Sequence, residues 1–189
     1  MRRGFKAEAE RLSVRLRKEI GVAPEIRINI DDLAKHVGIE VKSADELVPL
    51  DKLEQLDAIQ SGCFSAATFS LPDGRTVAIT NPVNTTKGRR DSDLAHEVAH
   101  ILLSHEPRRA DRLGGLTFFQ CDPEQEEEAN WLAGCLLLPR PLLLSEARRG
   151  LSAEQLAEKH SVSVAMARFR LNASGVYFQA ARARKIGRS

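Results

Sequence analysis

The first twenty residues follow the period of an amphipathic helix. Apolar side chains recur every three or four residues, which places them on one face of such a helix. This face consists of Phe5, Ala9, Leu12, Leu16 and Ile20. Gly21 and Pro24 then end the pattern. A second, shorter helix is expected from Asp31, as its N-cap, to Gly38. Residues 39–41 alternate between apolar and polar, as in a strand.

The middle of the chain predicts a β-hairpin followed by two helices. Residues 62–70 and 75–80 are strand-like and flank the turn sequence Leu-Pro-Asp-Gly. A helix is expected over 86–103 and another over 122–139, where Asp122 caps the start and Pro139 marks the end. The segment between these helices contains Pro107 and Gly114-Gly115 and is expected to be irregular, and residues 44–59 give no clear assignment.

The last part of the chain predicts a pair of short helices. They occupy 151–175 around the sequence His-Ser-Val, with Ser152 and Ser163 as N-caps and Gln155 completing a capping box with Ser152. A basic tail follows over 181–189. We therefore expect two units, residues 1–145 and 146–189, in an α+β fold with a small sheet packed against helices.

Composition narrows the class of protein. The 189 residues are 42% hydrophobic and 29% charged, which is typical of a globular domain and excludes a disordered chain. The formal charge of +2 is too small to mark the whole chain as a nucleic-acid binder. No apolar run is long enough for a membrane helix, and the first residues lack a signal-peptide core. Three cysteines without a CxxC spacing are typical of free thiols, so we expect a cytoplasmic protein.

The strongest chemical signal is the HExxH pentamer at residues 96–100. Four residues turn a helix by about 400°, so His96 and His100 project from one face and can bind one tetrahedral ion. Glu97 lies beside them, where it can act as a general base on a water molecule and return the proton to a leaving amine. The alternative is a solvated helix face that carries two histidines and binds nothing.

A catalytic zinc usually has three protein ligands, so a third is needed. His105 follows His100 by five residues, which rotates it away from the pair, and it is expected to end or cap the helix. His160 is expected in a turn near the C-terminus, as a surface or packing residue.

An acidic run supplies further candidates for the third ligand, namely Glu124, Glu126, Glu127 and Glu128. Carboxylates in a first helical turn are often only solvated partners of the helix dipole. Glu128, however, precedes Trp131 and Leu132 by three and four residues, which points it toward the buried side, where a carboxylate needs a partner. Glu127 and Glu124 fit this rule less well, so periodicity favours Glu128 without settling the choice.

Two motifs together resemble the ImmA/IrrE family of metallopeptidases. One is AHEVAHILLSH, residues 95–105, and the other is EEEANWLAGCLLLP, residues 126–139. The second is similar to the family pattern E-A-N-x-x-A-x-x-L-L-x-P, starting at Glu128. The resemblance extends more loosely to the N-terminal segments and the C-terminal helical pair. It implies a zincin-like fold, with His96, His100 and Glu128 as ligands of zinc or another divalent metal and Glu97 as the general base.

The resemblance also implies a biological role. Family members cleave a helix-turn-helix transcriptional repressor inside the cell and so release stress-response or transfer genes. The strand at 76–80 is a candidate for pairing with an extended substrate segment, unless it lies inside the sheet. The only tyrosine, Tyr177, has no predicted link to the metal.

The competing interpretation is a non-catalytic regulator that binds DNA or a protein partner and has a structural or vestigial metal site. It rests on the C-terminal pair, which resembles a DNA-binding helix-turn-helix with Arg168 and Arg170 on its second helix and a basic arm. The simpler interpretation is a pair packed on the core, because Met166, Phe169 and Leu171 offer apolar contacts. We expect this packing, and therefore a protein substrate, no membrane association, and DNA binding only as the lesser alternative.

Overall fold

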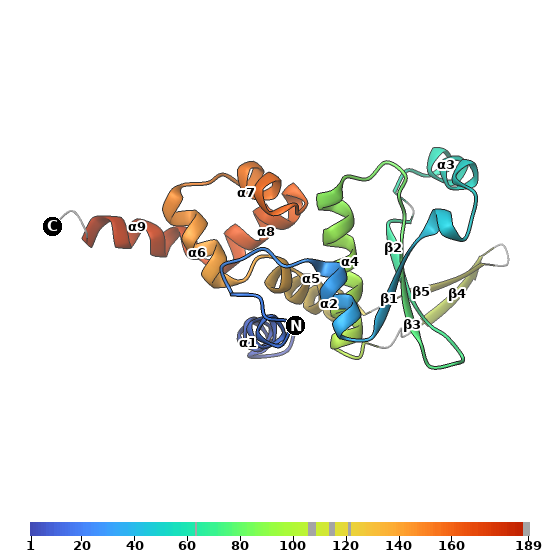
Figure 1. Ribbon diagram of the computed structural model, residues 1–189, viewed down its shortest axis with the longest axis horizontal. Coiled ribbons are helices and arrows are strands. Elements are labelled where there is room, and N and C mark those ends of the chain that lie inside the picture. Colours follow the sequence, from blue (N-terminus) through green and yellow to red (C-terminus); the bar gives the residue numbers. More distant parts are fainter. Residues whose placement is uncertain (63, 106–108, 114–115, 121, 187–189) are drawn as a thin grey trace.

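The chain has an α+β fold, as predicted. The computed structural model describes residues 1–62, 64–105, 109–113, 116–120 and 122–186. A small sheet lies at one end of the molecule, helices α4 and α5 lie in the middle, and the C-terminal helices extend toward the other end (Figure 1). Among the described residues, no helix combines the length and apolar character that crossing a bilayer requires.

The sheet has the strand order β1-β3-β2, formed by β1 (Ile39–Ser43), β2 (Ala66–Ser70) and β3 (Thr76–Thr80). The predicted hairpin of β2 and β3 is confirmed, and Gly74 takes the left-handed conformation of its turn, with φ +86°. The central strand β3 pairs with β1 in parallel and with β2 antiparallel. The expectation that residues 76–80 pair with a substrate is therefore wrong, because neighbouring strands occupy both edges of β3.

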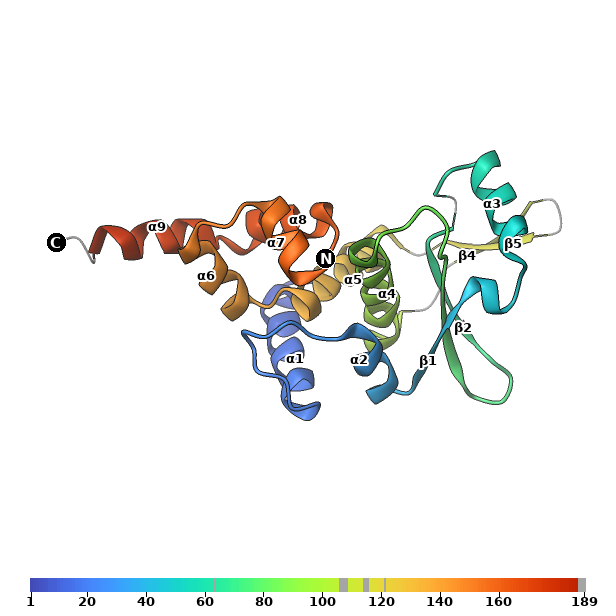
Figure 2. The ribbon, with the colours of Figure 1, turned by 45° about the horizontal axis from the view of Figure 1, so that its top comes forward.

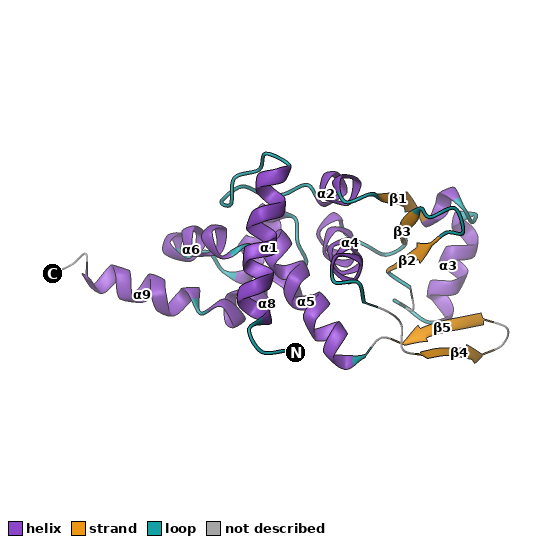
Figure 3. Cartoon of the chain, turned by 90° about the horizontal axis from the view of Figure 1, so that it is seen from below, coloured by secondary structure: helices purple, strands orange, loops and turns teal. Residues whose placement is uncertain are grey.

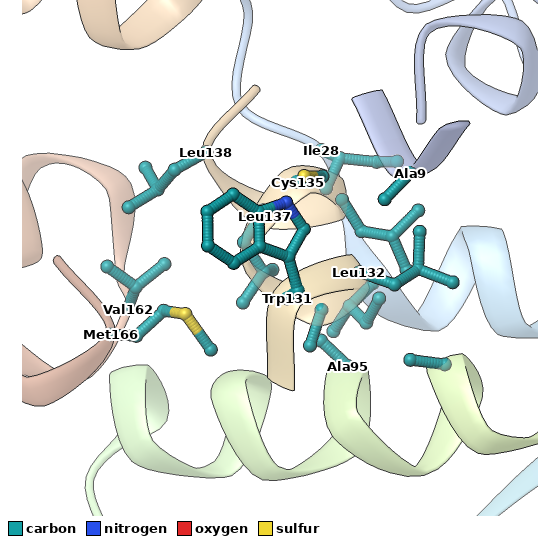
Figure 4. Close-up of a cluster of buried hydrophobic side chains, with 14 of the residues drawn as sticks. Ala9, Ile28, Ala95, Trp131, Leu132, Cys135, Leu137, Leu138, Val162 and Met166 are labelled. Carbon is teal, nitrogen blue, oxygen red and sulfur yellow. The ribbon is translucent and has the colours of Figure 1, made fainter. Parts of the chain in front are cut away.

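The two helices that carry the motifs form as predicted. Helix α4 (Lys87–Leu102) starts after Thr86, whose hydroxyl accepts a hydrogen bond from Arg89 N. Helix α5 (Pro123–Leu137) starts after Asp122, whose carboxylate accepts from Glu124 N. The two helices pack along each other through small and aliphatic side chains, and Figure 4 shows this core around Trp131.

Other segments differ from the sequence-based expectation. Helix α2 (Ile30–His36) is capped by Asn29 instead of Asp31, because the Asn29 side chain accepts from Asp31 N. The unassigned segment forms a 3-10 turn, η1 (Ala44–Glu46), and helix α3 (Leu50–Ile59).

The stretch expected to be irregular contains a two-stranded antiparallel ribbon of β4 (Arg109–Leu113) and β5 (Leu116–Gln120). In Figure 3 this ribbon lies at the same end of the molecule as the sheet. Pro107 and Gly114-Gly115, the residues that suggested irregular structure, lie outside the described residues.

Helix α1 (Phe5–Glu19) packs across α5 and is held there by buried polar side chains. Ser13 donates to the carbonyl of Cys135 at 2.6 Å, and the fully buried Arg17 donates to the carbonyl of Leu136 at 2.7 Å. Removal from water lowers the pKa of Arg17 to about 10. Cys135 carries a free thiol whose pKa burial raises to about 12, while Cys63 and Cys121 lie outside the described residues.

In the described residues after α5 the chain forms four helices, and the predicted pair is among them. They are α6 (Arg140–Arg149), α7 (Ala153–His160), α8 (Val164–Ser174) and α9 (Val176–Ile186), and α9 leads away from the body of the protein (Figure 2). The capping box of Ser152 with Gln155 and the cap at Ser163 form as predicted. A boundary between residues 145 and 146 would fall inside α6, whose apolar side chains belong to the same core as α4 and α5.

The α7–α8 pair is packed on the core at two places. At the first, Ser163 N donates to the hydroxyl of Ser92 on α4 at 2.9 Å, and Arg27 donates to the carbonyl of His160. At the second, the fully buried Arg170 on α8 donates to the carbonyl of Leu138 and to Glu10. The pair is therefore fixed to helices α4 and α5 and to the N-terminal helix.

Gly134 provides a test of the α5–α8 contact. A Cβ at this position would overlap Cδ of Arg170, which cannot move without breaking its buried hydrogen bonds. We expect Gly134→Ala to lower the free energy of unfolding by about 1–3 kcal/mol, although alanine favours helices. Urea unfolding measures this change, and Asn172→Ala on the exposed face of α8 should stay within about 0.5 kcal/mol of wild type. Equal stability of Gly134→Ala and wild type would contradict the packing.

Candidate metal centre

Helix α4 places the two predicted histidines on one face. His96 and His100 are one turn apart, and their Nε2 atoms lie 2.9 Å from each other. Their rings are partly exposed, with 22% and 13% of the side-chain surface accessible to solvent. Both nitrogens therefore point to the same place at the edge of the core.

Helix α5 brings a carboxylate to this histidine pair from its first turns. Glu126 Oε2 lies 3.1 Å from His96 Nε2, and Glu126 Oε1 lies 3.4 Å from His100 Nε2. One ligand atom from each of the three residues lies within 4.8 Å of the other two, and this is a group of the kind that could hold a metal ion. Two imidazole nitrogens and one carboxylate oxygen fit the donor set of a catalytic zinc site, which leaves the fourth position open.

Glu128 does not lie with the two histidines. It is buried as predicted, but its carboxylate faces the N-terminal segment, where Oε1 accepts a hydrogen bond from Arg2 N at 2.9 Å. Two residues along a helix correspond to a rotation of about 200°, so Glu126 and Glu128 face different neighbours of α5. The structure therefore brings Glu126, and not the predicted Glu128, together with the two histidines.

The remaining histidine candidates lie where they cannot complete the group. His105 lies just beyond the end of α4, with its Nδ1 3.1 Å from Nδ1 of His100, on the ring edge that faces away from Glu126. His160 is a buried packing residue at the end of α7, beside Glu146. Tyr177 lies on α9 and donates to the carbonyl of Leu151.

Glu97 points toward the sheet, next to the histidine pair. Its Oε2 accepts a hydrogen bond of 2.8 Å from the hydroxyl of Thr68 on strand β2. Burial raises the pKa of Glu97 above its usual range, and the Thr68 hydrogen bond and the His96 ring oppose this rise. A carboxylate with a raised pKa is suited to accept and return a proton. No motif or periodicity indicated that Thr68 would lie here.

A cavity of about 580 Å³ opens beside the site. His96, Glu97 and Glu126 form one part of its lining, and residues of the C-terminal pair form another part. The apolar portion consists of Trp131, Ala165, Met166 and Phe169, and the rings of Trp131 and Phe169 meet edge to face, with centroids 5.6 Å apart. The candidate site therefore lies in an open, partly apolar cleft.

His100 is held in its neutral form. Removal from water, together with the electrostatic influence of His96, lowers its pKa to about 4. Only a neutral imidazole can bind a metal through nitrogen. The ring is therefore available for metal binding at neutral pH and well below it.

Comparison with known proteins identifies a family. The sequence model of the Peptidase_M78 family, described as an IrrE N-terminal-like domain, matches residues 67–172, which is more than half of the chain. This range includes strand β3, both motif helices, α7 and all but the last two residues of α8. No curated protein matches the chain.

The choice between the two glutamates can be tested by metal affinity. We expect Glu126→Gln to weaken zinc binding by more than about 100-fold, because it removes a ligand, and Glu128→Gln to cause a clearly smaller loss. Competition with a chromophoric chelator measures both affinities. The same affinity in both variants, or a larger loss in Glu128→Gln, would restore Glu128 as the ligand.

The lowered pKa of His100 predicts a pH dependence of stability. Between pH 6.5 and about 4 the unfolded state binds a proton at this residue that the folded state does not, so acidification through this range lowers the free energy of unfolding. Metal-free wild type should lose stability more steeply over this range than metal-free His100→Gln. Urea unfolding at several pH values compares the two, and parallel profiles would rule out the assigned pKa.

Proposed function

The chain belongs to the Peptidase_M78 family of IrrE N-terminal-like domains, and on this basis we propose that it is a zinc-dependent endopeptidase of the cytoplasm that cleaves a helix-turn-helix transcriptional repressor. Membership supports a metallopeptidase-type function. The zinc ion, the substrate and the regulatory role are our proposal. The observation that carries it is the position of Glu97 next to the three candidate ligand atoms, at an open cleft.

The proposed ligands are His96, His100 and Glu126. Zinc suits two imidazoles and a carboxylate, and another divalent ion with similar preferences is the alternative. When bound, the ion supplies a Lewis acid that polarises the scissile carbonyl group.

Glu97 is the proposed general base. Its carboxylate takes a proton from the attacking water and returns it to the leaving amine, while the Thr68 hydroxyl, which donates to Oε2, keeps the side chain in place. Burial favours the protonated state that this step requires. A purely structural metal site has no need of such a group, so Glu97 supports catalysis over the alternative of a structural or vestigial site.

An extended segment of the substrate is expected beside strand β2. In the described part of the sheet, β2 pairs only with β3, so its other edge is free to add a strand. Thr68 of this strand donates a hydrogen bond to Glu97, so a peptide that paired with β2 would lie close to the proposed base.

The C-terminal pair supports a protein substrate more than DNA. Of the two α8 arginines that suggested DNA binding, Arg170 is fully buried and Arg168 is paired with Glu154. Met166 and Phe169 of the same helix line the cleft. We therefore assign the pair to substrate contact.

Substitution of the base tests the proposed reaction. Glu97→Gln should abolish peptide cleavage, with a loss of about 100-fold or more, while zinc binding stays close to wild type. Zinc-loaded protein is incubated with a proteome-derived peptide library and with purified helix-turn-helix repressors encoded nearby, and mass spectrometry identifies new termini. Cleavage by Glu97→Gln at the wild-type rate, or none by the zinc-loaded wild type, would contradict the proposal.

A further inference from the structure

Two buried polar side chains behind the metal centre have no role in the reaction proposed above. They are His105, with 6% of its side-chain surface exposed, and Glu128, with 11% exposed. His105 follows α4, and Glu128 is on α5. A buried imidazole and a buried carboxylate are costly to desolvate unless they have partners, so their arrangement requires an explanation.

His105 contacts the edge of the His100 ring that faces away from the candidate ligands. Its Nδ1 lies 3.1 Å from Nδ1 of His100, which is a hydrogen-bond distance, and the two ring centroids lie 5.1 Å apart. The opposite nitrogen of His100, Nε2, is the one near His96 and Glu126. The two nitrogens of His100 therefore have separate partners.

This contact defines which nitrogens carry protons. A neutral imidazole has one N–H, so His100 can use Nε2 as a metal ligand only when its proton is on Nδ1. That proton then needs an acceptor, and Nδ1 of His105 lies at hydrogen-bond distance, 3.1 Å. Accepting at Nδ1 requires His105 to carry its own proton on Nε2.

Glu128 lies on the side of His105 where that proton is needed. Glu128 Oε2 is 3.8 Å from His105 Nε2, a distance at which a carboxylate attracts an N–H group electrostatically. The other oxygen of Glu128 accepts a hydrogen bond from Arg2 N at 2.9 Å, and Arg2 Nε lies 3.6 Å from it. The N-terminal segment thus holds the carboxylate in place behind His105.

We propose that His105 and Glu128 are positioning residues, which hold His100 in the tautomer that presents Nε2 to the metal. The contacts run from Glu128 to His105 and from His105 to His100, so a second histidine lies between the carboxylate and the proposed metal ligand. A group that hydrogen-bonds to the other nitrogen of a metal-binding histidine commonly fixes the ring orientation and raises the basicity of the ring. The inference rests on the proposed metal site and adds two residues that act on the metal only through His100.

Zinc affinity of matched variants tests this role. His105→Leu should weaken zinc binding by about 10–100-fold, and His105→Gln, whose amide oxygen can still accept from His100, should restore part of the loss. Glu128→Gln should lose about tenfold, and Glu124→Gln, which removes the same charge from an exposed position of α5, should bind as wild type. Circular dichroism and thermal unfolding of the metal-free variants check that they fold.

Nitrogen-15 NMR of the imidazole rings in the zinc-loaded wild type gives an independent readout. It should show His100 protonated at Nδ1, and His105 protonated at Nε2 but not at Nδ1. A proton on His105 Nδ1 would overturn the inference and leave the proposed function intact. The same holds if His105→Leu and Glu128→Gln both bind zinc with wild-type affinity while Glu126→Gln loses it. Failure of the wild type to bind zinc would overturn both.

Discussion

The candidate site depends on how closely helices α4 and α5 approach each other. Ala95 and Ala99 on α4 and Ala129 and Ala133 on α5 are fully buried and carry only a methyl group. Small side chains in a helix contact allow the two backbones to lie close together, with aliphatic residues filling the space around them. This closeness brings a carboxylate of one helix within 3.1–3.4 Å of the imidazoles of the other. Larger side chains at these positions would separate the two histidines from Glu126.

The position of α5 is fixed in turn by buried arginines at its C-terminal end. The last carbonyl groups of a helix lack partners within the helix. Here Arg17 of α1 donates to the carbonyl of Leu136, and Arg170 of α8 donates to the carbonyl of Leu138. Buried charges of this kind are costly to desolvate, and they stabilise only the arrangement in which their hydrogen bonds are made. Helices from both ends of the chain thus define where α5, and with it Glu126, lies.

The sequence predicted the parts of the fold that have local signals. The turn Leu-Pro-Asp-Gly specified the hairpin, the caps Asp122 and Ser152 marked helix starts, and the helix expected from residue 86 starts one residue later, at Lys87. The family resemblance implied Glu128 as the third ligand, and the periodicity that favoured it indicates only that a side chain is buried, not which neighbouring helix it faces. In the structure α5 has a neighbour on each of two sides, so a buried carboxylate can face α1 or α4, and periodicity does not distinguish them. Glu126 lies on the same face of α5 as Ala129 and Ala133, and these small residues mark the side of the helix that approaches α4. The central position of β3 also depends on a distant segment, because β1 comes from residues far earlier in the chain.

The same contacts connect the C-terminal pair to the chemistry. Arg170 anchors α8 and lies near the ring of Trp131, with 5.8 Å between its guanidinium carbon and the ring centroid, and Trp131 meets Phe169 in the wall of the cleft. The wall that a substrate would contact is therefore built from α5 and α8 together. A helical pair that served only to bind DNA would not need to place apolar side chains beside Glu97 and His96. A pair that contacts a substrate, as we propose, would do so, and its turn is also tied to α4 by the hydrogen bond from Ser163 N to the Ser92 hydroxyl. The two short helices that resemble a helix-turn-helix in sequence are thus held by buried contacts against the helices that carry the candidate site.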